Sequence, residues 1–301
     1  METKPFKEYD EQRKLLENRG MCIDDIHYAE KKLSQIGYYR LSGFWHTART
    51  PIDEKTLSDQ FLPNTHFKNI HQLYIFDKRL RILLLDIIER LEINIRTVLA
   101  HEMGRFNPLA YLDEFYINPR FTEHYSKWKE KLEQQINKSR DDFVLWHKQK
   151  EAPLPFWAVV EIWDFGMLSK YYSMLKKRYQ NIIANRFNVD NTATLISWLN
   201  EINIIRNQSA HHSRVWNRKG NPIKILHNDY FNLLNLDQTA KERLFGRIAI
   251  MWYLISQTSN NYKWLLQCNH LIDKFPDVPN AKLKSMGLMS HLSLPIHLMN
   301  N

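Results

Sequence analysis

The most regular pattern of apolar and polar positions lies between residues 70 and 103. Apolar residues there recur at spacings of 4, 3, 4, 4 and 3, and they are Leu80, Leu84, Ile87, Leu91, Ile95 and Val98. These spacings trace one face of a helix, while charged residues such as Asp86 and Arg90 take other positions. Gly104 and Pro108 follow, and both residue types end helices. The pattern predicts one long amphipathic helix.

Shorter helical patterns lie on both sides of this stretch. We expect one helix closed by Gly20, a second from Asp24 or Asp25 to about Gly37, and another that starts at a cap on Asp190 or Asn191. The remaining helical patterns cover residues 121–149, 156–179 (one or two helices) and 239–266. The non-helical predictions are a linker or exposed loop at 48–66, a turn at 218–222 and an irregular tail from about Asp273.

Together these patterns predict an all-α protein. No stretch keeps the alternation typical of strands, and glycine is scarce, with 8 in 301 residues. We expect a core bundle of about four or five long helices. The predicted organisation is an N-terminal helical region with a linker at 1–62, a helical core at 63–266 and an irregular C-terminal tail at 267–301.

Composition narrows the classes of function. The chain has no glycine-rich phosphate loop, no serine-nucleophile elbow and no zinc motif, so we expect no metal and no cofactor. Two cysteines are too few for a disulfide framework, and neither a secretory signal nor an apolar run long enough for a membrane span is present. We therefore expect a cytoplasmic protein without a membrane partner. A net charge of +9 favours a polyanion such as nucleic acid, although it can also serve only solubility.

One segment concentrates cationic, imidazole and amide side chains. It reads RNQSAHHSRVWNR over residues 206–218 and contains no acidic residue. Metal-free RNA cleavage needs a base for the 2′-hydroxyl, an acid for the leaving 5′-oxygen and a cation for the phosphorane. Histidine suits both proton transfers near neutral pH, and arginine offers a planar fork to phosphate oxygens. Arg206, Asn207, His211 and His212 supply these groups, and no carboxylate pair for magnesium lies beside them in the sequence.

An arginine followed by a histidine after a few residues is weak evidence by itself. Similar spacings, of five to seven residues, occur at Arg40–His46, Arg96–His101 and Arg140–His147. The structural alternative is a helix C-terminus with favourable cations. The segment at 206–218 differs from the other copies by the asparagine after its arginine, its paired histidines and its lack of acids.

The segment resembles the R-N-x-x-x-H motif of HEPN ribonucleases, in the form found in Abi-like abortive-infection proteins of the AbiD/AbiF type. Residues 4–25, the aromatic stretch IGYYRLSGFW at 36–45 and residues 73–99 resemble that family in the same order. The resemblance covers roughly residues 4–260. It implies a HEPN-like helical bundle core with an N-terminal helical extension.

The resemblance also implies a function. It implies a metal-independent endoribonuclease toxin of a phage-defence or toxin–antitoxin system, restrained by a small structured RNA. Matched position by position, Arg206 holds the scissile phosphate, Asn207 orients, and His211 moves protons, while His212 is an additional candidate that the strict spacing does not require. The expected products carry a 2′,3′-cyclic phosphate and a 5′-hydroxyl.

Helix geometry bears on how such a site is completed. Residues five apart on an unbroken helix differ by about 140°, so Arg206 and His211 do not share a face. Either the helix is distorted here, or a second copy of the motif completes the centre. Since the family pairs two HEPN domains, we expect a homodimer with a composite site. The alternative is a second half-site at Arg96–His101 in the same chain, but Arg96 is expected to pair with Glu92 one turn away.

Further basic and aromatic residues are candidates for RNA binding. They are Tyr39, Arg40, Lys176, Lys177, Arg178, Arg214, Arg218 and Lys219. The stretch at 36–45 can stack on unpaired bases or, alternatively, pack the N-terminal helices on the body. The stretch at 170–180 can follow an RNA backbone or form a solvated helix face. Five tryptophans fall at helical spacings, and we expect most of them in the core: Trp128, Trp146, Trp157, Trp163 and Trp198.

Two other classes of function stay open from the sequence. One is a non-catalytic RNA-binding module that uses the same basic patch. The other is a helical protein-interaction adaptor, for which the positive charge is incidental.

Overall fold

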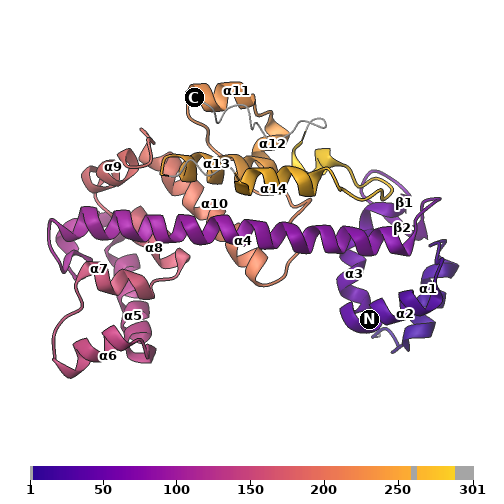
Figure 1. Cartoon of the computed structure of the whole chain (residues 1–301), viewed down its shortest axis with the longest axis horizontal. Coiled ribbons are helices and arrows are strands. Elements are labelled where there is room, and N and C mark those ends of the chain that lie inside the picture. The colour runs from indigo at the N-terminus through magenta and orange to yellow at the C-terminus, as the bar shows by residue number, and fades with distance from the viewer. Residues whose placement is uncertain (1–2, 259–262, 289–301) are drawn as a thin grey trace.

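A computed structural model describes residues 3–258 and 263–288, which form an all-α fold with one small sheet (Figure 1). The helices are α1 (Tyr9–Asn18), α2 (Ile26–Ile36), α3 (Tyr38–Trp45), α4 (Phe67–Gly104), α5 (Thr122–Lys138), α6 (Asp142–Gln149), α7 (Phe156–Val159), α8 (Phe165–Met174), α9 (Lys177–Asn185), α10 (Thr192–Ala210), α11 (Asp229–Leu234), α12 (Gln238–Glu242), α13 (Leu244–Ser256) and α14 (Lys263–Ile272). The strands are β1 (Arg49–Pro51) and β2 (Leu57–Phe61). Short 3-10 turns are η1 (His46–Ala48), η2 (Ala110–Leu112), η3 (Glu114–Tyr116), η4 (Pro119–Phe121), η5 (Val160–Ile162) and η6 (Leu283–Met286). The expected all-α class is confirmed.

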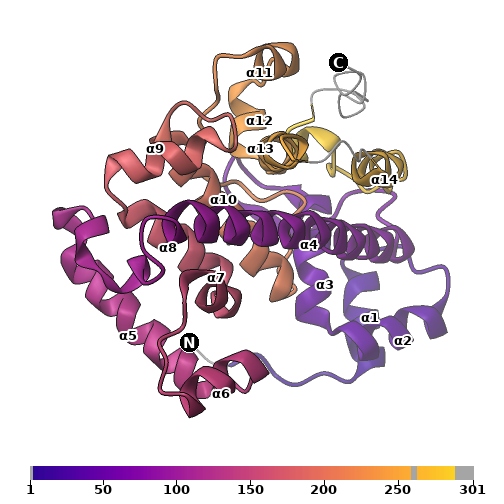
Figure 2. The ribbon, with the colours of Figure 1, turned by 60° about the vertical axis from the view of Figure 1, so that its left-hand side comes forward.

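The long helix α4 is the central element of the fold. It has 38 residues, as the apolar pattern predicts, and all six apolar positions of that pattern are buried. α13 and α14 lie on one side of α4, and α10 crosses behind it (Figures 1 and 2). Among the described residues, no helix is both long enough and apolar enough to cross a membrane.

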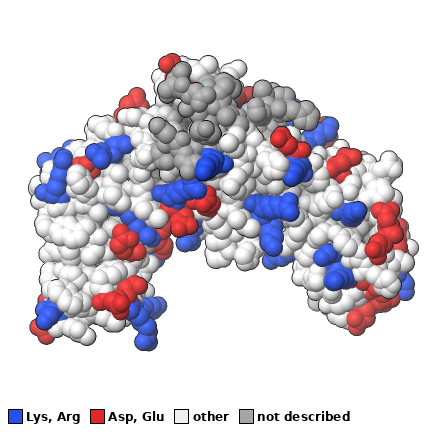
Figure 3. All heavy atoms as spheres, viewed as in Figure 1, with Lys and Arg blue, Asp and Glu red and all other residues white. Residues whose placement is uncertain are grey.

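Two lobes extend from the ends of α4. The N-terminal lobe consists of α1–α3 with the small sheet, and the opposite lobe consists of α5–α8 (Figure 1). The space-filling view has the outline of an arch with a broad hollow between the lobes (Figure 3). Basic and acidic side chains are both present around the hollow, so the net positive charge does not form one uniform patch on this face.

The first two helices of the N-terminal lobe end where the sequence predicts, and α3 follows them without having been predicted. The side chain of Asp25 accepts a hydrogen bond from Tyr28 N at 2.9 Å and so caps α2. Gly20 and Gly37 have φ of 87° and 88°, a left-handed region that only glycine adopts at low cost. These residues separate α1, α2 and α3.

The predicted linker at 48–66 instead contains the antiparallel hairpin of β1 and β2. Its turn is built by Asp53, whose carboxylate accepts hydrogen bonds from the amides of Lys55 and Thr56 at 2.8 and 2.7 Å. Asp59 then binds Arg49 across the hairpin and Arg19 of the preceding segment. Strands of three and five residues are too short to show an alternating pattern in the sequence.

The single helix predicted over 121–149 is interrupted, and α5 and α6 flank the break. The Ser139 hydroxyl donates to Asp141 Oδ2 at 2.6 Å, and Asp141 N donates back to Ser139 Oγ at 3.2 Å. Such local side-chain bonds compete with helical hydrogen bonds.

The helix predicted over 239–266 is also divided, into α12, α13 and the start of α14. Arg247 explains the first break, because its guanidinium donates to the carbonyls of Lys241 and Arg243 at 2.7 and 3.0 Å. Those carbonyls would accept backbone bonds in a continuous helix. Residues 259–262 and 289–301 lie outside the described residues, and the described part of the predicted irregular tail includes η6.

The tryptophan prediction is correct for three residues and wrong for two. Trp128, Trp163 and Trp198 are buried, whereas Trp146 and Trp157 are 53% and 56% exposed. The exposed positions follow from the short helices that carry them, because α6 and α7 each pack one narrow face on the body.

Candidate functional site

The segment with the arginine–histidine pattern closes α10. Arg206 and Asn207 lie in the last turns of the helix, and His211 is its C-terminal cap. This end of α10 emerges below α4, between the two lobes (Figure 1). The described structure thus places the pattern at the hollow of the arch.

The helix ends in a Schellman motif. The amide of His212 donates to Ser209 O at 3.2 Å, and the amide of Ser213 donates to Gln208 O at 2.8 Å. His212 has a φ of 59°, in the left-handed region that glycine favours at this position. A histidine therefore stands where backbone energetics favour a glycine.

Both histidine side chains are exposed, and Arg206 is half-buried. Within residues 3–258 and 263–288, neither imidazole makes a hydrogen bond or a ring contact. Arg206 Nη1 donates to Asn207 Oδ1 at 3.1 Å. The imidazoles are thus free to meet a ligand, and the asparagine holds the guanidinium.

Two carboxylates that are distant in sequence lie near Arg206. They are Glu92 of α4 and Asp164, which caps α8. Burial raises the pKa of Glu92, and Arg96 and Arg206 oppose this shift. Burial also acts to raise the pKa of Asp164, but the bonds from Lys131 and the Met167 amide, with the charge of Arg206, bring that pKa below its usual value. The sequence segment lacks acids, but the fold brings them to its arginine.

Arg96, the arginine of the arginine–histidine pair in α4, has a structural role. Arg96 pairs with Glu92 at 2.5 Å, as the i,i+4 spacing predicts, and it donates to Trp163 O at 2.7 Å. His101 is exposed and lies 3.2 Å from Glu102 Oε1. Arg96 is therefore engaged inside the fold.

The helix carrying the main motif is regular up to its C-terminal cap. α10 is helical through Ala210, so Arg206 and His211 point in directions about 140° apart. Arg206 lies near Glu92, whereas the turn after His212 contacts Arg81. Glu92 and Arg81 are separated by about 16 Å along α4. The Arg206 side chain and the backbone that follows the histidines thus lie near different parts of the long helix.

Arg40 of α3 is brought to the histidine turn. Arg40 Nη1 donates to His212 O at 2.9 Å, and Tyr39 is 76% exposed beside it in sequence. Phe44 and Trp45 are buried in the same short helix. One face of the stretch at 36–45 therefore packs the lobe, as one of the two alternatives expects, and the other face lies at the surface.

The three basic residues after the histidines differ in their freedom. The Arg214 guanidinium donates to Gly43 O, and burial, aided by Arg218, lowers the pKa of Arg214 against the attraction of Asp77. Lys219 pairs with Glu242 at 2.7 Å. Arg218 is exposed, and no ion pair to it occurs within the described residues. Arg218 is thus the most available of the three for a ligand.

The basic stretch at 176–178 is not part of this site. Lys177 Nζ donates to Thr192 Oγ1 at the start of α10, and Lys176 and Arg178 lie 4.5 and 5.3 Å from the ring centre of Phe115. The length of α10 puts these residues about 27 Å from the histidines.

The sequence does not single out Asp77, which lies behind the histidine turn. Asp77 Oδ1 accepts from the amides of Val215 and Trp216, both at 2.9 Å. A signal exists, because Asp77 falls between Leu73 and Leu80 at spacings of 4 and 3 and is thus a charge on the apolar face of α4.

Buried polar atoms without a partner are frequent near the motif. Of the 12 such side-chain atoms among the described residues, four lie between Gln208 and Asn217. They are Gln208 Oε1, Ser209 Oγ, Trp216 Nε1 and Asn217 Oδ1. Buried unsatisfied groups are rare in native proteins and concentrate where a ligand or water binds.

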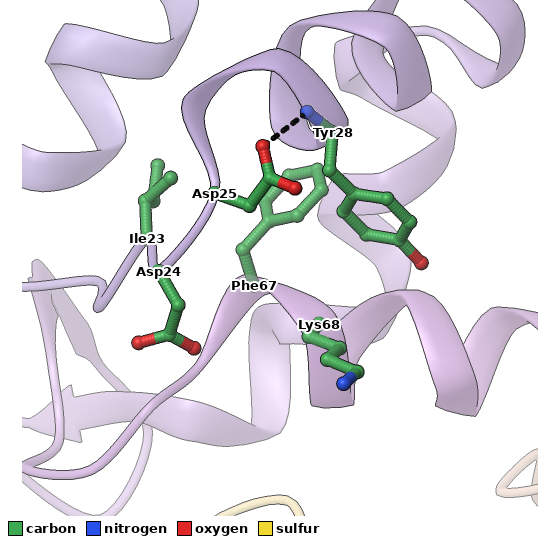
Figure 4. Close-up of a pocket in the computed structure, with 6 residues that line it drawn as sticks. All are labelled: Ile23, Asp24, Asp25, Tyr28, Phe67 and Lys68. Atoms are coloured by element: carbon green, nitrogen blue, oxygen red, sulfur yellow. Dashed lines mark hydrogen bonds between the residues drawn. The ribbon is translucent and has the colours of Figure 1, made fainter.

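The histidine side chains are exposed at the surface. A cavity of about 260 Å³ lies elsewhere, between α2 and the start of α4, and Asp24, Asp25, Tyr28 and Lys68 are among its lining residues (Figure 4). Asp25 is occupied there as a helix cap. In the described parts of the chain, no group of three or more His, Cys, Asp or Glu side chains is placed to hold a metal ion.

Comparison with known proteins agrees with part of the sequence resemblance. Neither the curated proteins nor the solved structures give a match. A model of the Abi-like protein family matches residues 31–217, which is more than half of the chain. The matched segment runs from α2 to the residues just beyond the histidine turn, so it includes α4 and the whole of α10. The chain therefore belongs to the Abi-like protein family.

Proposed function

We propose that this chain is a metal-independent endoribonuclease that acts in abortive infection. Membership of the Abi-like family connects the chain with abortive infection, a form of phage defence. The observation that carries the enzymatic part is the turn after α10. There, two exposed imidazoles stand just beyond Arg206 and Asn207.

The proposed reaction uses only groups of this chain. The imidazole of His211 takes the proton of the RNA 2′-hydroxyl, and the 2′-oxygen attacks the adjacent phosphorus. The bond from phosphorus to the 5′-oxygen breaks, and the imidazolium of His212 returns a proton to that oxygen. The Arg206 guanidinium binds the phosphoryl oxygens as their charge increases, and Asn207 orients it. The products carry a 2′,3′-cyclic phosphate and a 5′-hydroxyl.

The surroundings of the turn suit an RNA chain. Tyr39 offers an exposed ring for stacking on an unpaired base, and Arg40 and Arg218 offer cations at the surface. An open position between two lobes admits a polymer, whereas small molecules favour enclosed pockets. A small structured RNA that covers this surface would restrain the enzyme.

We further propose that the active unit is a homodimer. In one chain, Arg206 and His211 diverge on a regular helix, and Arg206 lies near Glu92 while the backbone after the histidines contacts Arg81. A second copy related by a two-fold axis can bring its His211 to the Arg206 of the first.

The direct test is cleavage of total RNA in magnesium-free buffer with a chelator. We expect His211→Ala and Arg206→Ala to lose cleavage by at least about 100-fold and to keep the thermal unfolding profile. His101→Ala is the matched control, because His101 is an exposed histidine of the other arginine–histidine copy. It should cleave at the wild-type rate.

The same experiment separates the alternative function. If the wild-type chain binds RNA in a salt-dependent manner but leaves it intact, the site is a non-catalytic RNA-binding module that uses the same residues. Wild-type rates in both the His211→Ala and Arg206→Ala variants would exclude the proposed catalytic roles.

A further inference from the structure

A buried carboxylate lies directly behind the histidine turn. Asp77 of α4 is fully buried, and its Oδ1 accepts hydrogen bonds from Val215 N and Trp216 N, both at 2.9 Å. Its Oδ2 forms an ion pair with Arg81 one turn further along α4. One carboxylate thus joins the central helix to a segment 138 residues away in sequence.

The neighbouring residues of the turn are also fixed through their backbone. Arg40 donates to His212 O at 2.9 Å, and Arg81 Nη1 donates to Ser213 O at 3.4 Å. The Arg214 side chain donates to Gly43 O of α3. Every residue from 212 to 216 is therefore tied to α3 or α4, while the imidazoles themselves are exposed. The backbone of the turn is therefore fixed, while the imidazoles of His211 and His212 remain exposed.

A charged group in this position is not explained by stability alone. Burial raises the pKa of Asp77, and the two amides and Arg81 oppose that shift. Replacing a buried ion pair by apolar side chains of similar size is often neutral or stabilising, and in some proteins such a pair instead specifies a geometry. Here, the geometry that it fixes is that of the turn.

We propose that Asp77 is a positioning residue of the nuclease site: through the amides of Val215 and Trp216 it sets where His211 and His212 stand relative to Arg206. Arg206 has its own supports, on α10 and near Glu92. Asp77 thus adjusts one half of the motif against the other and touches neither the RNA nor the imidazoles. The expected effect on cleavage rests on the proposed function, whereas the expected effect on the position of the histidine turn does not.

The test compares three double variants. Asp77→Leu with Arg81→Met removes the acceptor and leaves no charge unpaired in the core. Asp77→Asn with Arg81→Met also removes both charges but restores an oxygen for the two amides. Asp86→Ala with Arg90→Ala is the matched control, because it removes an exposed i,i+4 pair of the same type from the same helix.

Each variant is examined by hydrogen exchange, by NMR of the histidine side chains and by cleavage kinetics. The Leu/Met variant should lose the slow exchange of the Val215 and Trp216 amides and shift the imidazole signals of His211 and His212. Its kcat should fall about 100-fold, while KM stays within about threefold. The Asn/Met variant should recover much of the exchange protection and part of kcat, and the control should behave as wild type.

A Leu/Met variant that is folded and matches the Asn/Met variant in imidazole signals and kcat would overturn the proposal. If the Leu/Met variant does not fold, the wild-type chain still decides. Fast exchange of the Val215 and Trp216 amides there would overturn the proposal, because it would show that Asp77 does not hold them. An inactive wild-type chain refutes the nuclease function alone, because exchange and NMR still decide whether Asp77 fixes the turn.

Discussion

His212 is the single residue at which backbone energetics and chemistry are most clearly opposed. Its left-handed φ of 59° at a helix end costs a non-glycine residue about 1 kcal/mol. Residues held in such conformations cluster at functional sites, where the side chain has a use beyond folding. The exposed imidazole beside His211 fits that description.

We expect His212→Gly to raise the free energy of unfolding by about 1 kcal/mol, because glycine adopts the left-handed region without steric cost. Cleavage should fall, since a proton-transfer group is lost. Urea unfolding and cleavage rates measure the two effects. Asn235→Gly is the control, because Asn235 ends α11 with a φ of 43° and lies outside the motif, so cleavage should be unchanged. A less stable His212→Gly variant would mean that the imidazole supports the fold.

The sequence singles out the residues of the candidate site but not the contacts that support them. Arg206, Asn207, His211 and His212 stand out through residue type and spacing, and the lack of acids beside them is visible. The contacts that complete the site depend on how α10 crosses α4. Asp77, Glu92 and Arg40 meet the motif across 100 residues or more, and no local pattern encodes such a meeting.

Among the helices, α10 is fixed to the C-terminal part of the chain by a buried ion pair. Glu201 Oε2 lies 2.6 Å from Arg247 Nη2 of α13, and both side chains are less than one-tenth exposed. Asn221 also donates to Glu201 Oε1 at 3.3 Å. The helix that carries the motif is therefore locked at its middle, five residues before Arg206.

We expect Arg247→Met to destabilise the fold by about 3–5 kcal/mol, because it leaves the Glu201 carboxylate buried without a counter-charge. Adding Glu201→Gln should recover part of the loss, and a double-mutant cycle in urea measures the coupling. Lys127→Ala is the control, since its i,i+4 pair with Glu123 is exposed and contributes little. A double variant no more stable than Arg247→Met would contradict this account.

Which elements the sequence predicts depends on their length and on what ends them. α4 and α10 are long, amphipathic or capped by local residues, and their patterns are therefore visible. The hairpin at 49–61 is made by a side-chain turn and two very short strands. The separation of α12 from α13 depends on Arg247, whose direction is fixed by Glu201 across the core. Long-range contacts of this kind override the local pattern.

At the scale of the whole molecule, each copy offers the two halves of the motif in different directions. We expect a mixture of His211→Ala and Arg206→Ala chains to regain activity, although each variant alone is inactive. In a composite dimer, one of the two sites of a mixed pair combines an intact arginine with an intact histidine.

At equal concentrations with free exchange, the mixture should show about a quarter of the wild-type rate, because half of the dimers are mixed and each has one intact site. Cleavage assays after co-refolding measure this recovery, and mixing His211→Ala with wild-type chains calibrates exchange. An active wild-type enzyme whose variants never complement each other would mean that the site is built within one chain.

The length of α4 has a consequence for control of the protein. The helix is about 57 Å long, has no proline and no internal glycine, and such helices bend gently rather than hinge. Its early turns carry Asp77 and Arg81 behind the histidines, and its middle carries Glu92 near the arginine. The rigid helix α4 thus fixes the distance between the residues that support the histidines and the residue near Arg206. For the nuclease dimer that we propose, control would act by covering this surface or by separating the two copies, because α4 fixes the spacing within one copy.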